Sequence, residues 1–147
     1  MFLILHVTCL SSFDEPFFMN ILAKMNDING VNGYVSFETA KLLSEKGYNN
    51  TIRSHYDDNG ILLVSTYAAF WVTPAPTYGQ ALEWLRSKNV YASFYVDKDE
   101  NNKATWQFAF YDKYLNLLAD DCGISITDYN KCVELAIVYA AKFLIYK

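Results

Sequence analysis

Two segments of the sequence alternate apolar and polar side chains on both sides of a short polar turn. This pattern restricts the fold more than any other feature of the chain. In the second segment, VYASFYV is joined to ATWQFAFY by the loop DKDENNK. Alternation with a period of two is typical of β-strands, and here each strand has one strongly apolar face. We therefore predict a hairpin over residues 90–111 that buries that face.

The first segment, TIRSHYDDNGILLVSTY, covers residues 51–67 and has Asn59-Gly60 at its centre. Asn-Gly between two strand-like runs is a strong hairpin signal. The run after the turn begins with apolar residues on both faces, which is typical of a central strand. A weaker strand signal covers residues 115–118. We expect both hairpins to lie in one antiparallel sheet of four or five strands.

Three helices are expected from their end signals. Ser36 is an N-cap and Gly47 a C-terminal stop, which predicts a helix over residues 36–46. Thr77 and Gln80 form a capping-box pattern after two prolines that end a strand, and they predict a helix over residues 78–88. A long apolar helix follows Thr127 or Asp128 and runs to about Tyr146.

The predicted order is therefore α–β–β–α–β–β(–β)–α, in the α+β class, as a two-layer sandwich of an antiparallel sheet and helices. We assign residues 34–147 to a single domain. Residues 1–33 form an N-terminal leader that need not belong to the core, since Met1, Met19 and Met25 are alternative starts.

Composition restricts the function. The formal net charge is −4, whereas domains that neutralise nucleic-acid phosphates are usually basic, so nucleic acid is an unfavoured partner. The apolar N-terminal run is too short for a membrane span, and we expect no membrane contact. Three cysteines without a CxxC pair indicate reduced thiols and a cytoplasmic location. Neither histidine has metal-ligand spacing, and no phosphate-binding glycine loop is present. We expect no metal, no cofactor, no catalytic residues and no enzymatic activity.

A resemblance adds context to this interpretation. The segments VSFETAKLLSEKGY, YDDNG and PAPTYGQALEWLR, followed by a tyrosine-rich amphipathic helix, resemble a group of small hypothetical proteins of gut-commensal bacteria and their prophages and mobile elements. The similarity covers about residues 34–145. It implies a cytoplasmic protein of phage or mobile-element type, and it implies no activity and no site residues.

The face of the sheet that the helices leave open is one candidate contact surface. Aromatic and arginine side chains are enriched in protein interfaces, so we expect this face to bind a protein partner. The alternative is single-stranded nucleic acid, which stacks its bases on aromatic side chains. The residues expected on this face are Arg53, His55, Tyr91, Tyr95, Gln107 and Tyr111.

The last helix is a second candidate surface, because it is apolar on nearly every side. A helix of this kind is normally buried all round, and one small sheet covers only one side. We therefore predict a homodimer in which the uncovered side packs against a second copy. The residues of this expected dimer face are Leu135, Val138, Tyr139 and Tyr146.

Overall fold

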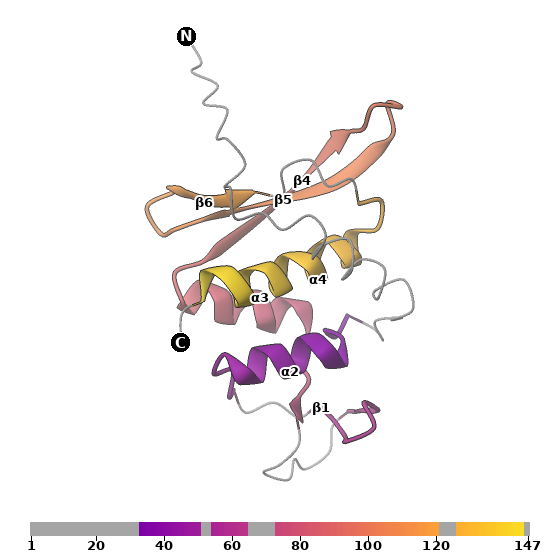
Figure 1. The fold of residues 1–147 in the computed structure, drawn as a ribbon, viewed down its shortest axis with the longest axis vertical. Helices are drawn as coiled ribbons and strands as arrows, with labels where there is room; N and C mark the ends of the chain where they lie inside the picture. Colours follow the sequence, from indigo (N-terminus) through magenta and orange to yellow (C-terminus); the bar gives the residue numbers. More distant parts are fainter. Residues whose placement is uncertain (1–32, 51–53, 65–72, 121–125, 146–147) are drawn as a thin grey trace.

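The computed structural model describes residues 33–50, 54–64, 73–120 and 126–145 (Figure 1). The leader expected over residues 1–33 and the end of the last helix at Tyr146 lie outside this range, apart from Gly33. In the described part, helices and antiparallel strands follow each other in nearly the predicted order. The α+β class is thus confirmed. None of the helices in the described part is long and apolar enough to cross a membrane.

The helices begin where their caps were predicted. Helix α2 covers Phe37–Glu45, and the Ser36 hydroxyl accepts a hydrogen bond from the Thr39 N–H. Helix α3 covers Tyr78–Ser87, and Thr77 and Gln80 form the complete capping box. Helix α4 covers Tyr129–Tyr139 with Asp128 as its N-cap, and a π-helical turn, η1, continues it over Ala140–Leu144. These ends are local features, which explains why the sequence predicted them.

The strands form two sheets of three strands each. The first sheet has the order β2-β1-β3, with β1 at His55–Tyr56, β2 at Leu62–Leu63 and β3 at Thr73–Pro74. The second has the order β4-β5-β6, with β4 at Tyr91–Lys98, β5 at Ala104–Tyr111 and β6 at Leu117–Asp120. All pairs within them are antiparallel.

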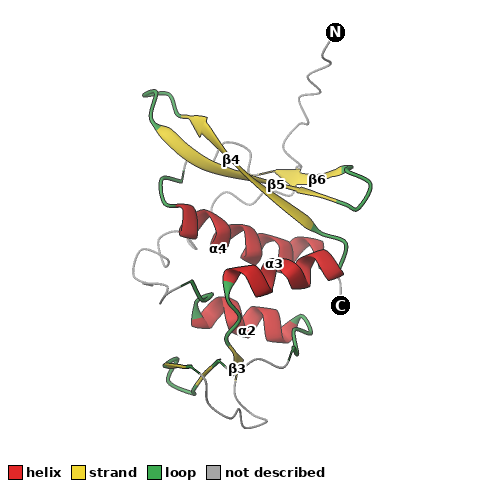
Figure 2. Ribbon diagram, turned by 180° about the vertical axis from the view of Figure 1, so that it is seen from behind, coloured by secondary structure: helices red, strands yellow, loops and turns green. Residues whose placement is uncertain are grey.

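The prediction of one sheet built from both hairpins was wrong. β1 pairs with β2 on one side and with β3 on the other, so the first hairpin completes a small sheet of its own. The helices lie between the two sheets, with α3 and α4 next to the second sheet and α2 nearer the first (Figures 1 and 2). Both edges of β1 are occupied, and the helices that lie between the two sheets separate β2 and β3 from the second sheet.

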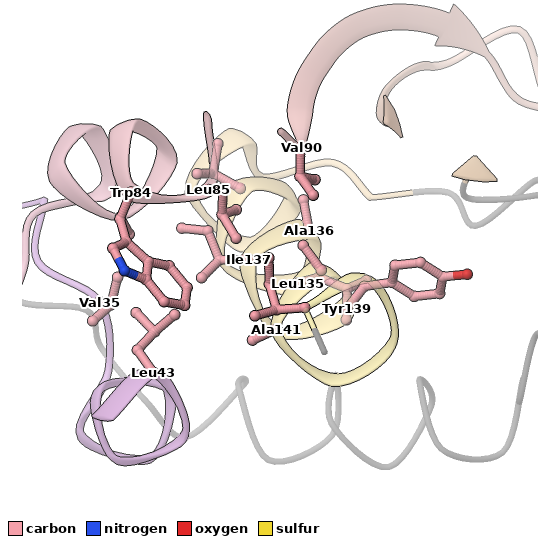
Figure 3. Close-up of a cluster of buried hydrophobic side chains, with 14 of the residues drawn as sticks. Val35, Leu43, Trp84, Leu85, Val90, Leu135, Ala136, Ile137, Tyr139 and Ala141 are labelled. Atoms are coloured by element: carbon pink, nitrogen blue, oxygen red, sulfur yellow. The ribbon is translucent and has the colours of Figure 1, made fainter. Parts of the chain in front are cut away.

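The core lies where α4 meets the other two helices and the second sheet. Figure 3 shows Trp84 of α3 pointing toward Leu43 of α2 and Val35, which precedes that helix, while Leu135 and Ile137 lie on α4. All five side chains are buried. On the other side of α4, Tyr139 stacks on Phe110 of β5, with ring centroids 5.8 Å apart and an interplanar angle of 9°. Helix α4 is therefore covered both by helices and by the sheet.

This arrangement overturns the expected dimer face. Leu135, Val138 and Tyr139 are buried within the single chain, and Tyr146 lies outside the described residues. The apolar character of α4 was interpreted as a side without cover. The fold covers that side itself, because the helix lies between the second sheet and the α2 and α3 helices.

Candidate functional site

Four of the six residues predicted for the open sheet face do come together. In the register of β4 and β5, Tyr91 lies opposite Tyr111 and Tyr95 lies opposite Gln107. Directly opposed residues point to the same side of a sheet. Phe94, Phe108 and Phe110 have the other parity and join the core, so the tyrosines point away from the helices.

The other two predicted residues do not join this face. His55 lies in β1, in the first sheet, where it is buried opposite Leu63 and Pro74. Arg53 lies outside the described residues. The predicted combination of these two residues with the tyrosines depended on a single sheet, and the two sheets separate His55 from them.

Only the β4 side of the tyrosine face is exposed. Tyr91 and Tyr95 expose 39% and 41% of their surface, whereas Thr105 and Ala109 of β5 are buried. Val96, on the opposite side of β4, is 56% exposed. Strand β4 thus shows apolar surface on both of its sides near the turn that leads to β5.

Strand β4 is also an edge strand among the described residues, since its one neighbour there, in the order β4-β5-β6, is β5. The Asp99 N–H donates to the Lys103 carbonyl at 2.9 Å, which fixes the phase of the hydrogen-bond ladder. Hydrogen-bonded pairs alternate along antiparallel strands. Odd-numbered residues of β4 therefore bond to β5, and the N–H and C=O groups of Ala92, Phe94 and Val96 point away from it.

Within the described ranges, the ends of this edge are closed and its centre pairs with no other strand. The Val90 N–H donates to the Leu85 carbonyl at the end of α3, and the Lys98 N–H donates to the Asp97 side chain at 2.7 Å. Edge strands are usually protected by proline, by a bulge or by inward-pointing charge. Residues 91–96, YASFYV, contain none of these protections. This edge is a template for pairing with another strand.

The turn between β5 and β6 adds a second exposed apolar feature. Tyr114 is 73% exposed and Leu115 80% exposed, and Leu115 has a positive φ of 65°. This left-handed conformation is unfavourable for a leucine and is normally occupied by glycine or asparagine. We call β4 together with this turn, residues 112–116, the sheet rim.

The same turn geometry occurs at the other two hairpins, which makes Leu115 stand out. In each turn an aspartate carboxylate accepts hydrogen bonds from the N–H groups two and four residues later, and the residue three positions after it has positive φ. Gly60 and Asn102 occupy this position in the β1–β2 and β4–β5 turns. In the β5–β6 turn, the Asn116 side-chain amide also donates to Asp112 and lowers the pKa of that carboxyl.

The two ends of β4 differ in charge, with lysines at its start and an excess of acidic residues in the turn that follows it. Lys88 and Asn89 precede the strand, and the Lys113 N–H donates to the Asn89 side chain at 2.9 Å, so two lysines and one aspartate, Asp112, belong to this end. The turn at the other end carries more acidic than basic residues. Its charged residues are Asp97, Lys98, Asp99, Glu100 and Lys103.

A buried polar cluster lies between α2 and α4. Glu134 exposes only 3% of its surface, and its Oε1 accepts hydrogen bonds from the Ser36 N–H, at 2.9 Å, and from the Thr39 hydroxyl. Its Oε2 has no hydrogen-bond partner at ordinary distance in the described part of the chain. We call Glu134, Ser36, Thr39, Tyr56 and Tyr78 the Glu134 cluster.

Two tyrosine hydroxyls of this cluster are electrostatically coupled to the carboxylate. Burial, and then the charge of Glu134, raise the pKa of Tyr56 from 10.0 to about 12, and the Tyr56 hydroxyl donates to the Val35 carbonyl. Burial and Glu134 also raise the pKa of Tyr78. Since Ser36 caps α2, the carboxylate also lies at the positive end of that helix dipole. The cluster fastens α2 to α4.

The sequence contained one signal for this cluster. Glu134 is the only charged residue in the otherwise apolar run CVELAIVYAA, and a buried charge needs partners. The partners come from residues about a hundred positions earlier, so spacing could not identify them. Metal ligands are not assembled here or elsewhere in the described ranges, where no three His, Cys, Asp or Glu side chains are grouped.

No family model, no curated protein and no solved structure matches this chain. The resemblance of residues 34–145 to small prophage and mobile-element proteins therefore stays a prediction.

Proposed function

We propose that the chain is a non-catalytic protein-interaction module that contacts its partner through the sheet rim. The observation that carries the proposal is the open edge of β4, where the backbone groups of Ala92, Phe94 and Val96 point outward beside exposed side chains. An extended segment of a partner can add to such an edge as a further strand. Main-chain hydrogen bonds then supply affinity, and the neighbouring side chains supply specificity.

The side chains of the rim suit a protein partner. Tyrosine is enriched at interfaces because it offers a large contact area together with a hydroxyl that can form hydrogen bonds. Tyr91, Tyr95 and Tyr114 are all exposed, and Val96 and Leu115 add aliphatic surface beside them. The fold itself gains nothing from exposing these groups. Burial in a contact would remove their apolar surface from water.

Site-specific photo-crosslinking tests this proposal. A photoreactive phenylalanine analogue placed at Tyr95 should give protein adducts in cells, and the same analogue at Ile61 should not. Ile61 is a matched control, because it is 56% exposed and lies in the turn of the other hairpin. Adducts of equal yield at both positions, or none at Tyr95, would contradict the proposal.

Single-stranded nucleic acid is the second candidate. The pairs Tyr91–Tyr111 and Tyr95–Gln107 lie on one side of the sheet and offer rings for base stacking. The net charge of −4 and the separate position of His55 weigh against it. Fluorescence anisotropy with a labelled oligonucleotide at low salt distinguishes the two. Binding that falls with salt and is lost in Tyr95→Ala would favour nucleic acid over protein.

The proposal includes a cellular context that rests on sequence alone. Its support is the cysteine usage, which indicates reduced thiols and the cytoplasm, and the resemblance to phage and mobile-element proteins. Cys132, in α4, is buried in the core. Fractionation of cells that express the full chain tests the location.

A further inference from the structure

We propose that the partner is a second copy of this chain, and that two β4 strands pair antiparallel about a twofold axis at Phe94. This inference rests on the proposed function, because it names the occupant of the same edge. The result would be a continuous sheet of two three-stranded halves. It replaces the dimer expected through α4, whose apolar side chains are buried in the single chain.

The backbone selects this register. The alternation points the N–H and C=O groups of Ala92, Phe94, Val96 and Lys98 outward, and the Lys98 N–H is already bonded to the Asp97 side chain. An axis at Phe94 pairs Phe94 with its own copy and Ala92 with Val96 of the second copy, so each outward N–H meets an outward C=O. Shifting the axis by one residue would leave a carbonyl opposite an N–H that is already bonded, either at Val90 or at Lys98.

The side chains fit the same register. On the tyrosine side, Ser93 of one copy lies opposite Tyr95 of the other, so a small side chain faces a large one. On the other side, Val96, 56% exposed in the single chain, lies opposite Ala92 of the second copy. Cross-strand pairs of this kind are the elementary stabilising contacts of a sheet. In this register residues 91–97 of one copy lie opposite residues 97–91 of the other, and no pair places two like charges opposite each other.

Charge favours the antiparallel direction. When two β4 strands pair antiparallel, the acidic turn after β4 of one copy lies beside the start of β4 of the other. The acidic residues of that turn are Asp97, Asp99 and Glu100, and the start of β4 has Lys88 and Lys113 beside a single carboxylate, Asp112, so that its charge is positive. Lys98 and Lys103 reduce the net charge of the turn without reversing it. Opposite charges that approach in this way select the partner and its orientation.

Sedimentation velocity over a range of concentrations tests for the dimer. One strand pair buries less surface than a standard interface, so we expect a monomer–dimer equilibrium with a dissociation constant of roughly tens of micromolar. Val96→Lys should weaken it by at least about tenfold, because a lysine on an edge strand opposes pairing. Ile61→Lys is the matched control and should leave it unchanged, since Ile61 is equally exposed.

Disulfide trapping tests the register. A mixture of the Ser93→Cys and Tyr95→Cys chains should oxidise to a mixed dimer, because these positions oppose each other and their Cβ atoms would be about 5 Å apart. Each variant alone should not cross-link at this edge, since its cysteines would lie diagonally and too far apart. The wild-type chain, with Cys9, Cys122 and Cys132, gives the background.

The outcomes separate this inference from the proposed function. A wild-type chain that stays monomeric at several hundred micromolar overturns self-pairing, while protein adducts at Tyr95 would still support a contact with a different protein. A dimer that resists Val96→Lys and forms no mixed disulfide overturns the β4 edge as its interface. A dimer that forms the mixed disulfide and is lost in Val96→Lys supports the inference.

Discussion

In the Glu134 cluster polar side chains lie inside the protein, whereas in the sheet rim apolar side chains lie outside it. Both regions go against the ordinary preference of their residues. In the cluster part of the cost is compensated nearby, because Oε1 of Glu134 receives hydrogen bonds from the Ser36 N–H and the Thr39 hydroxyl. In the rim, Val96 and Leu115 remain 56% and 80% exposed in the folded chain.

The difference shows how the two regions serve the protein. Folding accounts for the cluster, since the buried carboxylate joins the start of α2 to the middle of α4 and its donors are satisfied. Folding of the described residues does not account for the rim, where an exposed leucine has an unfavourable φ and no second strand among them pairs with the outer edge of β4. Variants of the cluster should therefore change stability, and variants of the rim should change association.

The largest effect is expected from Glu134→Ala. The substitution leaves the Ser36 N–H and the Thr39 hydroxyl without their acceptor and opens a cavity between α2 and α4, which should cost about 3 kcal/mol of unfolding free energy. Urea unfolding measures it. Glu83→Ala is the control, because Glu83 is exposed and makes only a surface ion pair with Arg86. Equal stability of the two variants would mean that the cluster does not fasten the helices.

Alkaline pH should act on the same cluster with an intermediate effect. The pKa of Tyr56 is raised from 10.0 to about 12 in the folded chain, so the folded state favours the protonated hydroxyl. The contribution of the protonated Tyr56 hydroxyl to the unfolding free energy is fully present below pH 10 and is lost as the pH rises toward 12. We expect the unfolding free energy to fall over that interval.

The Tyr56→Phe variant identifies the source of this pH dependence. Its unfolding free energy should fall less steeply between pH 10 and 12, although the raised pKa values of Tyr48, Tyr78 and Tyr139 will keep part of the slope. Tyr114→Phe removes a hydroxyl that is exposed and should leave the slope as it is. An unchanged slope in Tyr56→Phe would show that the Tyr56 hydroxyl is not the source of this pH dependence.

The sequence predicted those features that depend on neighbouring residues. Ser36 and Thr77 cap their helices through bonds to residues three positions later, and the alternation of residues 91–96 placed Tyr91 and Tyr95 on one side of a strand. The β5–β6 hairpin was also expected, with its last strand two residues earlier than observed.

Features that depend on distant residues were not predictable in the same way. The second partner of β1 is β3, and nothing in the hairpin sequence specifies it. The cover of Leu135 and Tyr139 comes from the helices and from β5, so an apolar helix looked uncovered when it was not. The positive φ of Leu115 was not predictable from the sequence either, because that turn position usually contains glycine or asparagine.

The smallest effect, and the sharpest comparison, comes from exchanging residues between two turns of the same geometry. Leu115→Asn should raise the unfolding free energy by about 1 kcal/mol, because asparagine tolerates positive φ and the leucine contributes little burial when it is 80% exposed. Asn102→Leu, in the β4–β5 turn, should lower it by a similar amount. The double variant should return to nearly the wild-type value, since the turns lie at opposite ends of β5. If Leu115→Asn instead lowers the unfolding free energy, packing within the chain holds the leucine. Leu115 would then serve folding and would no longer support the rim as a contact surface.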